Sequence, residues 1–160
     1  MDQALAAVKQ FHEKFNQAKC RLKLDPHGPL AYKFQAAGLA LLKLSKEVLM
    51  GDSGDPIEKR GHLMLEELGE TLLGISKNSE VETLDGLADQ IYVVAGTALC
   101  FDLPLAEVFF EVHRSNMTKS VISKVTDPRM RTKGPFYEPP QVGEILAAYR
   151  TKQINMIEEM

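Results

Sequence analysis

Three glutamates lie inside a leucine-rich stretch of the chain, "MLEELGETLLG", at residues 64–74. Glu66, Glu67 and Glu70 have no lysine or arginine three or four residues away. Because an α-helix turns about 100° per residue, the three carboxylates share one side of a helix with Leu63. The surrounding leucines suggest that this helix is largely buried. Buried carboxylates without a partner cost several kcal/mol each, so the stretch predicts a compensating positive charge.

A second acidic pair lies in the next stretch, "LDGLADQIYVVAG", at residues 84–96. Asp85 and Asp89 are four residues apart, which places them on one helix face, and they also lack a nearby cation. Antiparallel packing of the two stretches through a short connection would bring the two acidic groups together. Acidic residues on a helix more often form a solvated face, and that simpler interpretation stays open.

Clustered carboxylate oxygens are typical ligands of a hard divalent cation. Mg²⁺ takes oxygen ligands in octahedral geometry and bridges to phosphates, and Mn²⁺ fits the same ligands. Zinc favours cysteine and histidine, which are absent from both acidic faces. A di-iron carboxylate bundle requires Glu-x-x-His pairs, and no histidine of this chain follows a glutamate by three residues.

Helical periodicity dominates the chain, so we expect an all-α bundle of about five to six helices in a single domain, 1–160. Asp55 is predicted to cap one helix with Glu58 as capping-box partner, and Ser79 with Glu82 to cap the next. A Pro-rich loop, 126–140, could include a short extended pair. The expected helices cover residues 2–19, 31–50, 56–77, 80–100, 104–122 and 141–157.

The composition narrows the class of protein. Of 160 residues, 44% are hydrophobic and the net charge is -3, which gives no reason to expect nucleic-acid or membrane binding. Cys20 and Cys100 do not suggest a disulfide framework, and Cys100 is expected in the core. No leader peptide and no run of about 18 apolar residues is visible, so a cytoplasmic setting is expected. The helix at 80–100 is apolar almost all round, which indicates a homodimer or a dimer of dimers.

Other side chains suggest contact with a ligand. Asn116 and Lys119 fall on the apolar side of the helix at 104–122, where polar groups need a partner; a hydrogen-bonded helix end is the alternative. Tyr92 follows Asp89 by three residues and either closes the metal site or packs in the core. Glu107, Glu111 and Arg114 can pair with one another on the opposite face of that helix. His62 lies one turn before Glu66 and could touch the site, but it is expected to face solvent.

Together these motifs resemble the all-α nucleoside triphosphate pyrophosphohydrolases, the MazG-like group that includes phosphoribosyl-ATP pyrophosphohydrolase and the dimeric dUTPases. The family signature is an EExxE on one helix and an ExxD on the next. One departure is visible, since Gly86 stands at the glutamate of ExxD and Asp85 is the adjacent acidic residue. The stretches that carry the resemblance are "EELGE" (66–70), "GLAD" (86–89), "EVHRSNMTK" (111–119), "KGPFYEPP" (133–140) and "QFHEKF" (10–15).

The resemblance implies hydrolysis of a (deoxy)nucleoside triphosphate to the monophosphate and pyrophosphate by a metal-activated water. It implies Mg²⁺, or Mn²⁺, on Glu67, Glu70 and Asp89 with help from Asp85, and Glu66 as a further ligand or the base. The catalytic set is then Glu66, Glu67 and Glu70, with Asn116 on the nucleotide, Lys119 and Lys133 on the phosphates, and Tyr92 beside the substrate. Two alternatives stay open: a catalytically weakened nucleotide-binding module with a regulatory role, favoured by Gly86, and a structural bundle without a ligand.

Overall fold

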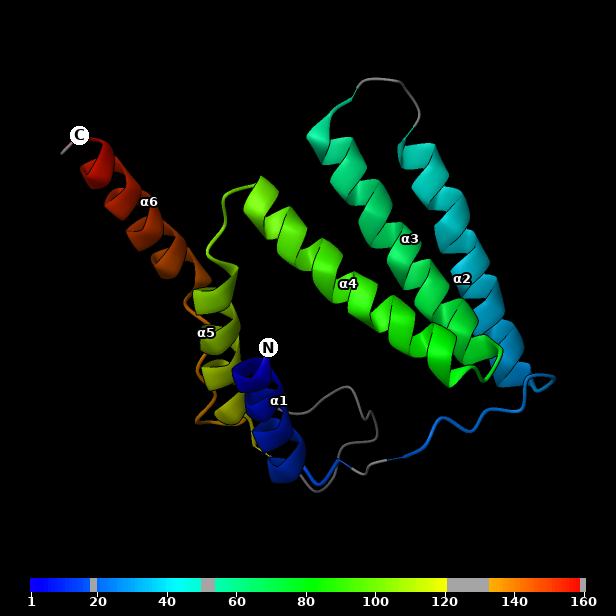
Figure 1. Ribbon diagram of the computed structural model, residues 1–160. Helices are drawn as coiled ribbons and strands as arrows, with labels where there is room; N and C mark the ends of the chain where they lie inside the picture. The colour runs from blue at the N-terminus through cyan, green and yellow to red at the C-terminus, as the bar shows by residue number, and fades with distance from the viewer. Residues whose placement is uncertain (18–19, 50–53, 121–132, 159–160) are drawn as a thin grey trace. The chain divides into compact units, whose positions relative to one another are not determined.

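The computed structural model describes residues 1–17, 20–49, 54–120 and 133–158 (Figure 1). All regular secondary structure within these ranges is helical, so the predicted all-α class is confirmed. The chain divides into two compact units, one comprising Cys20–Asp102 and the other Met1–Lys19 with Leu103–Met160. The helices are α1 (Asp2–Lys14), α2 (Pro29–Val48), α3 (Pro56–Ser76), α4 (Glu80–Cys100), α5 (Leu105–Met117) and α6 (Val142–Glu158).

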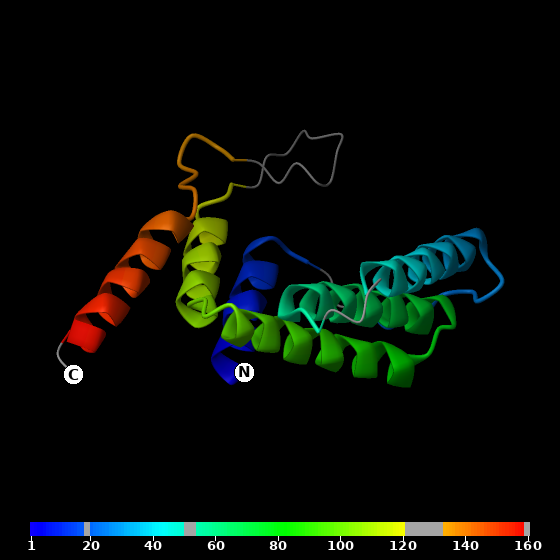
Figure 2. The same ribbon diagram turned by 90° about the horizontal axis from the view of Figure 1, so that it is seen from above.

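The unit at Cys20–Asp102 is an antiparallel helical bundle with α3 in the middle. Helix α3 packs against both α2 and α4, and α4 returns along α3 after a three-residue connection (Figures 1 and 2). Asn78 in this connection has a φ of 55°, a left-handed conformation that asparagine tolerates. Its side-chain oxygen accepts a hydrogen bond from the backbone N–H of Leu24 at 2.8 Å, which ties the segment before α2 to the turn.

Small residues, rather than the leucines, form the buried surface of α3. A Cβ added to Gly69 would lie 3.0 Å from the carbonyl oxygen of Gly38, and one added to Gly38 would lie 2.8 Å from that of Gly69. The backbones of α2 and α3 therefore touch at this crossing. Leu68 is 40% exposed, whereas the other leucines of this stretch are half-buried, so the helix is only partly buried rather than largely buried as expected. The fully buried residues of α3 are Gly69, Thr71, Gly74 and Ser76.

Side-chain caps begin both acidic helices. A carboxylate oxygen of Asp55 accepts from the N–H of Ile57 at 2.8 Å, and Ser79 Oγ accepts from the N–H of Glu82 at 3.2 Å. The predicted capping box at Ser79 is only half formed. The N–H of Ser79 donates to the carbonyl of Gly74 at 3.0 Å, and the Glu82 carboxylate pairs with a lysine instead.

In the other unit, α5 contacts both α1 and α6. Rings of Phe11 and Phe15 stack along α1 with centroids 4.6 Å apart, as the helical spacing predicts. Helix α1 ends at Lys14, earlier than predicted, because Asn16 takes a positive φ of 49°. Of the predicted loop, residues 133–140 hold a turn and no strand, whereas 126–132 lie outside the described residues.

In the described parts of the chain, none of the helices taken alone has the length and apolar character of a membrane span. Only α4 and α5 counted together across their break reach the length and composition of one.

Candidate functional site

The antiparallel pair α3 and α4 brings the two acidic groups together, as predicted. Burial raises the pKa of Glu67 above its ordinary value, and the negative charge of Asp89, Glu70, Glu66 and Asp85 raises it further. Two of these neighbours come from α3 and two from α4. The carboxylates therefore repel one another across the helix pair, and within the described residues no Lys or Arg side chain offsets the charge around Glu67.

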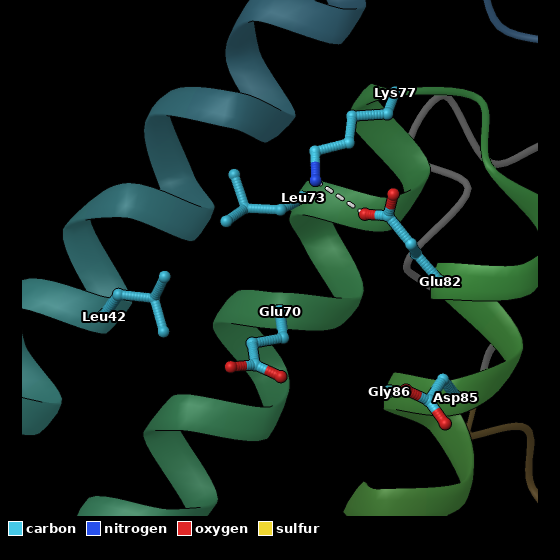
Figure 3. Close-up of a pocket in the computed structure, with 7 residues that line it drawn as sticks. All are labelled: Leu42, Glu70, Leu73, Lys77, Glu82, Asp85 and Gly86. Atoms are coloured by element: carbon cyan, nitrogen blue, oxygen red, sulfur yellow. Dashed lines mark hydrogen bonds and ion pairs between the residues drawn. The ribbon is translucent and has the colours of Figure 1, made fainter.

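A cavity of about 250 Å³ opens beside this group (Figure 3). Glu70 on α3 and Asp85 on α4 stand on either side of it, and an ion pair between Lys77 and Glu82, 2.6 Å long, lies at one end. Lys77 follows Glu70 by seven residues, which is two helical turns. Lys77 is therefore not a neighbour of Glu70 at the three- or four-residue spacing, but it lies on the same side of α3 at the seven-residue spacing. Leu42, Leu73 and Gly86 complete the lining.

Gly86, which stands where the ExxD motif has its glutamate, lies at a close contact between α3 and α4. A Cβ at this position would lie 2.5 Å from Oγ1 of Thr71 and 3.0 Å from its Cα and N atoms. Thr71 itself is buried, accepts a hydrogen bond from the Gln90 side chain and donates one to the carbonyl of Glu67 at 2.9 Å. A side chain at position 86 would push the helices apart. Asp85, the adjacent residue, is exposed and lines the cavity.

His62 does not face solvent, so that expectation is wrong. Its side chain is 16% exposed, with Nε2 3.3 Å from a carboxylate oxygen of Glu66 and Nδ1 3.0 Å from the carbonyl oxygen of Ser45. The four-residue spacing between His62 and Glu66 was a visible signal of this contact. The carbonyl of Ser45 comes from α2, and sequence spacing alone could not have indicated it.

The donor set fits a hard divalent cation. In the described part of the chain, no three Asp, Glu, His or Cys side chains converge closely enough to hold a metal ion as they stand. The raised pKa of Glu67 nevertheless records uncompensated negative charge among oxygen ligands, which is the environment that Mg²⁺ or Mn²⁺ requires. Rotation of the exposed Glu70, Asp85 and Asp89 side chains would be needed to complete the coordination.

Tyr92 lies on α4, three residues after Asp89, and its side chain is 82% exposed. The alternative that it packs in the core is therefore wrong. Its place beside the substrate stays a prediction. Cys100 is likewise exposed rather than part of the core, and both cysteines are free thiols.

The predicted substrate-side residues belong to the other compact unit. Lys119 donates to the Asn116 side chain at 2.6 Å, and the ammonium of Lys133 lies 5.1 Å from the ring centroid of Tyr137. Asn116 and Lys119 are half-buried. Their role at the nucleotide and the phosphates stays a prediction.

An ion-pair network fixes the loop that precedes α6. Arg114 donates from Nε and Nη2 to the two oxygens of Glu111, both at 2.8 Å, and also pairs with Glu138. Glu111 further accepts from the N–H of Gln141 at 2.9 Å, and Ser115 Oγ donates to the carbonyl of Glu138 at 2.8 Å. The predicted pairing of Glu111 with Arg114 is confirmed. The C-terminal end of the stretch "KGPFYEPP" is thus held against α5.

Comparison with known proteins gives a match to the part of the chain that carries both acidic helices. Residues 43–116 match the family model described as phosphoribosyl-ATP pyrophosphohydrolase. That family is a member of the all-α NTP pyrophosphohydrolase superfamily, to which this segment is therefore similar. The match includes Glu66, Glu67, Glu70, Asp85 and Asp89, although it covers less than half of the chain.

The resemblance drawn from the sequence is therefore confirmed. The matched family acts as a hydrolase on phosphoric anhydrides. Members of the family generally use a divalent metal such as Mg²⁺. No match to this chain was found among curated proteins or among solved structures.

Proposed function

We propose that this protein hydrolyses a (deoxy)nucleoside triphosphate to the monophosphate and pyrophosphate in a Mg²⁺-dependent reaction. The observation that carries the proposal is the packing of α3 against α4, which places Glu70 and Asp85 on one cavity and brings carboxylates from both helices near Glu67. The match over residues 43–116 supplies the class of reaction. Mn²⁺ is a candidate substitute because it accepts the same oxygen ligands.

Glu67, Glu70 and Asp89 are the proposed primary ligands, and Asp85 assists them from the cavity wall. Bound Mg²⁺ would neutralise part of the polyphosphate charge and lower the pKa of a water molecule. Glu66 then acts as a further ligand or as the base that takes the proton from that water.

The substrate contacts come from residues outside the carboxylate group. Asn116 is proposed to bind the nucleotide, Lys119 and Lys133 its phosphates, and Tyr92 to close the metal site.

A panel of triphosphates tests the proposal. Pyrophosphate release is measured with Mg²⁺, with and without EDTA, for the wild type, Glu70→Gln and the control Glu47→Gln. Glu47 is an exposed glutamate of α2 that pairs with Lys43 at 3.7 Å, outside the acidic group. We expect Glu70→Gln to lose at least about 100-fold in kcat and Glu47→Gln to resemble the wild type. Equally low release by the wild type and Glu70→Gln from every substrate would rule out the enzyme.

A regulatory nucleotide-binding module is the second candidate, and the packing of Gly86 against Thr71 favours it. That packing leaves no room for the glutamate that completes the family's ExxD motif. Calorimetric titration with Mg²⁺ and a non-hydrolysable triphosphate separates the candidates. Tight binding without any pyrophosphate release from the hydrolysable counterpart would indicate the module.

A homodimer, or a dimer of dimers, is proposed from the apolar side chains that α4 exposes. Val81, Leu84 and Leu99 are 80%, 69% and 82% exposed, and such a surface normally marks an interface. Light scattering after gel filtration measures the mass. Leu99→Glu is expected to shift an oligomer toward monomer, and a monomeric wild type would contradict the assembly.

A further inference from the structure

His62 connects the end of α2 to the acidic face of α3. Its two ring nitrogens contact two different oxygens, the carbonyl of Ser45 at 3.0 Å and the carboxylate of Glu66 at 3.3 Å. The imidazole is thus held at both ends.

The Ser45 contact satisfies a carbonyl at the end of a helix. The last four carbonyls of an α-helix have no partner within the helix, and α2 ends at Val48. The N–H of Leu49, four residues after Ser45, donates to the carbonyl of Glu47 instead. A carbonyl can only accept, so Nδ1 of His62 is the donor, and the ring plane is set by α2.

The Glu66 contact differs from the ordinary ion pairs on the surface of this protein. The pairs Lys9–Glu13 and Lys43–Glu47 have the same four-residue spacing, but they are longer, at 3.8 and 3.7 Å. Their lysine side chains are 70% and 81% exposed, whereas the His62 side chain is 16% exposed. A contact to a half-buried carboxylate from a fixed ring restricts that carboxylate far more than an exposed lysine can.

We propose that His62 is a positioning residue that holds the carboxylate of Glu66 in the orientation the hydrolytic site requires. With Nδ1–H donating to Ser45, Nε2 can donate to one oxygen of Glu66 only when the ring carries both protons. The other oxygen is then left for the metal or the attacking water. Partners behind a ligating or catalytic group commonly change affinity or rate by about 10-fold to 100-fold when they are removed. This inference rests on the proposed function, and it adds a residue that touches neither substrate nor metal.

A double-mutant cycle on His62 and Glu66 provides the test. The proteins are the wild type, His62→Leu, Glu66→Gln, the double variant, His62→Gln and the control His27→Leu, whose histidine is exposed. For each, kcat and KM for pyrophosphate release, Mn²⁺ affinity and thermal midpoint are measured. We expect His62→Leu to lower kcat or Mn²⁺ affinity about tenfold with a smaller change in KM. His62→Gln, which keeps a donor for Glu66, should recover part of the loss.

The coupling between the two sites decides the outcome. If His62 acts through Glu66, adding His62→Leu to Glu66→Gln should lower kcat or Mn²⁺ affinity little further. If the losses of the two single variants multiply in the double variant, the inference is overturned. It is also overturned if His62→Leu behaves as the wild type. A ring ¹H–¹⁵N spectrum of the metal-free protein gives a readout that does not need activity. Glu66→Gln should shift the Nε2 resonance of His62, and an unchanged resonance would overturn the inference. Absence of hydrolysis and of Mn²⁺ binding by the wild type, with that resonance shifted, would instead refute the proposed function.

Discussion

Gly86 and Thr71 form the closest contact between α3 and α4 in the acidic region. A Cβ on Gly86 would lie 2.5 Å from Thr71 Oγ1 and 3.0 Å from two backbone atoms of the same residue. Because backbone atoms cannot rotate away, a larger residue must separate the helices. The glycine therefore holds Glu67 and Asp89 at the distance that lets them interact.

Gly86→Ala is expected to destabilise the protein by about 1 to 3 kcal/mol, as overpacking of a close contact does. Chemical unfolding in urea measures the loss. Gly61→Ala on α3 is the matched control, because its Cβ would meet only a Val48 methyl group at 3.4 Å. That control should be neutral or stabilising by up to about 1 kcal/mol, since alanine favours a helix. Similar stabilities of the two variants would contradict the tight contact. Gly86→Glu should fail to raise activity for the same reason.

Glu67→Gln is expected to stabilise the metal-free protein. The pKa of Glu67 in the folded state lies above its ordinary 4.5, so the folded protein loses stability as the pH rises from about 4.5 through the raised pKa. At a pH above the raised pKa the repulsion is fully present, and removing it there should raise the thermal midpoint by about 1 to 3 °C. With added Mg²⁺ the wild type should instead have the higher thermal midpoint, because the ion stabilises the wild type more than Glu67→Gln. A lower midpoint of Glu67→Gln in EDTA would contradict this prediction.

The α5 network should respond to acid in a defined range. The Arg114 side chain, helped by the N–H of Gln141, lowers the pKa of Glu111 from 4.5 to about 2. A carboxylate with a lowered pKa contributes stability above its ordinary value, so the contribution is complete above pH 4.5 and is lost as the pH falls toward 2. Carboxyl ¹³C shifts measured against pH report Glu111 directly. Arg114→Gln should return its midpoint toward 4.5, and a wild-type midpoint near 4.5 would show that the network does not form in solution.

Ser79→Ala is expected to cost about 1 kcal/mol, as the loss of an N-cap typically does. Its hydroxyl accepts from Glu82, one turn before Asp85, so fraying would also disturb the cavity wall. Amide hydrogen exchange in the first turn of α4 provides the measurement. The corresponding cap variant Asp55→Ala should raise amide exchange in the first turn of α3 instead. If either variant raised exchange equally in α3 and α4, the caps would not act locally.

The sequence predicts the helices well because their start signals are local. Ser79 and Asp55 lie immediately before α4 and α3, and both cap their helices as expected. The half-formed box at Ser79 could not be foreseen, because Glu82 pairs with Lys77 across the turn. The pairing depends on how the turn between α3 and α4 bends, which spacing along the sequence does not give.

For the candidate site, the sequence indicates the carboxylates but not their supports. Glu67 and Asp89 share a pattern that periodicity reveals, whereas the contact of His62 with Ser45 joins two helices. The leucines mislead for a physical reason. At the crossing of α2 and α3 the glycines Gly38 and Gly69 occupy the backbone contact, and Leu42 and Leu73 pack beside it.

The main-chain contacts on both flanks of α3 give the acidic site a fixed frame. With α2 seated at Gly69 and α4 at Thr71, an incoming cation cannot draw the helices inward. Only side-chain torsions are left to adjust the distances between oxygens. Selection among divalent ions would then depend on which ionic radius the glutamate and aspartate rotamers can enclose, with longer glutamates reaching further than aspartates.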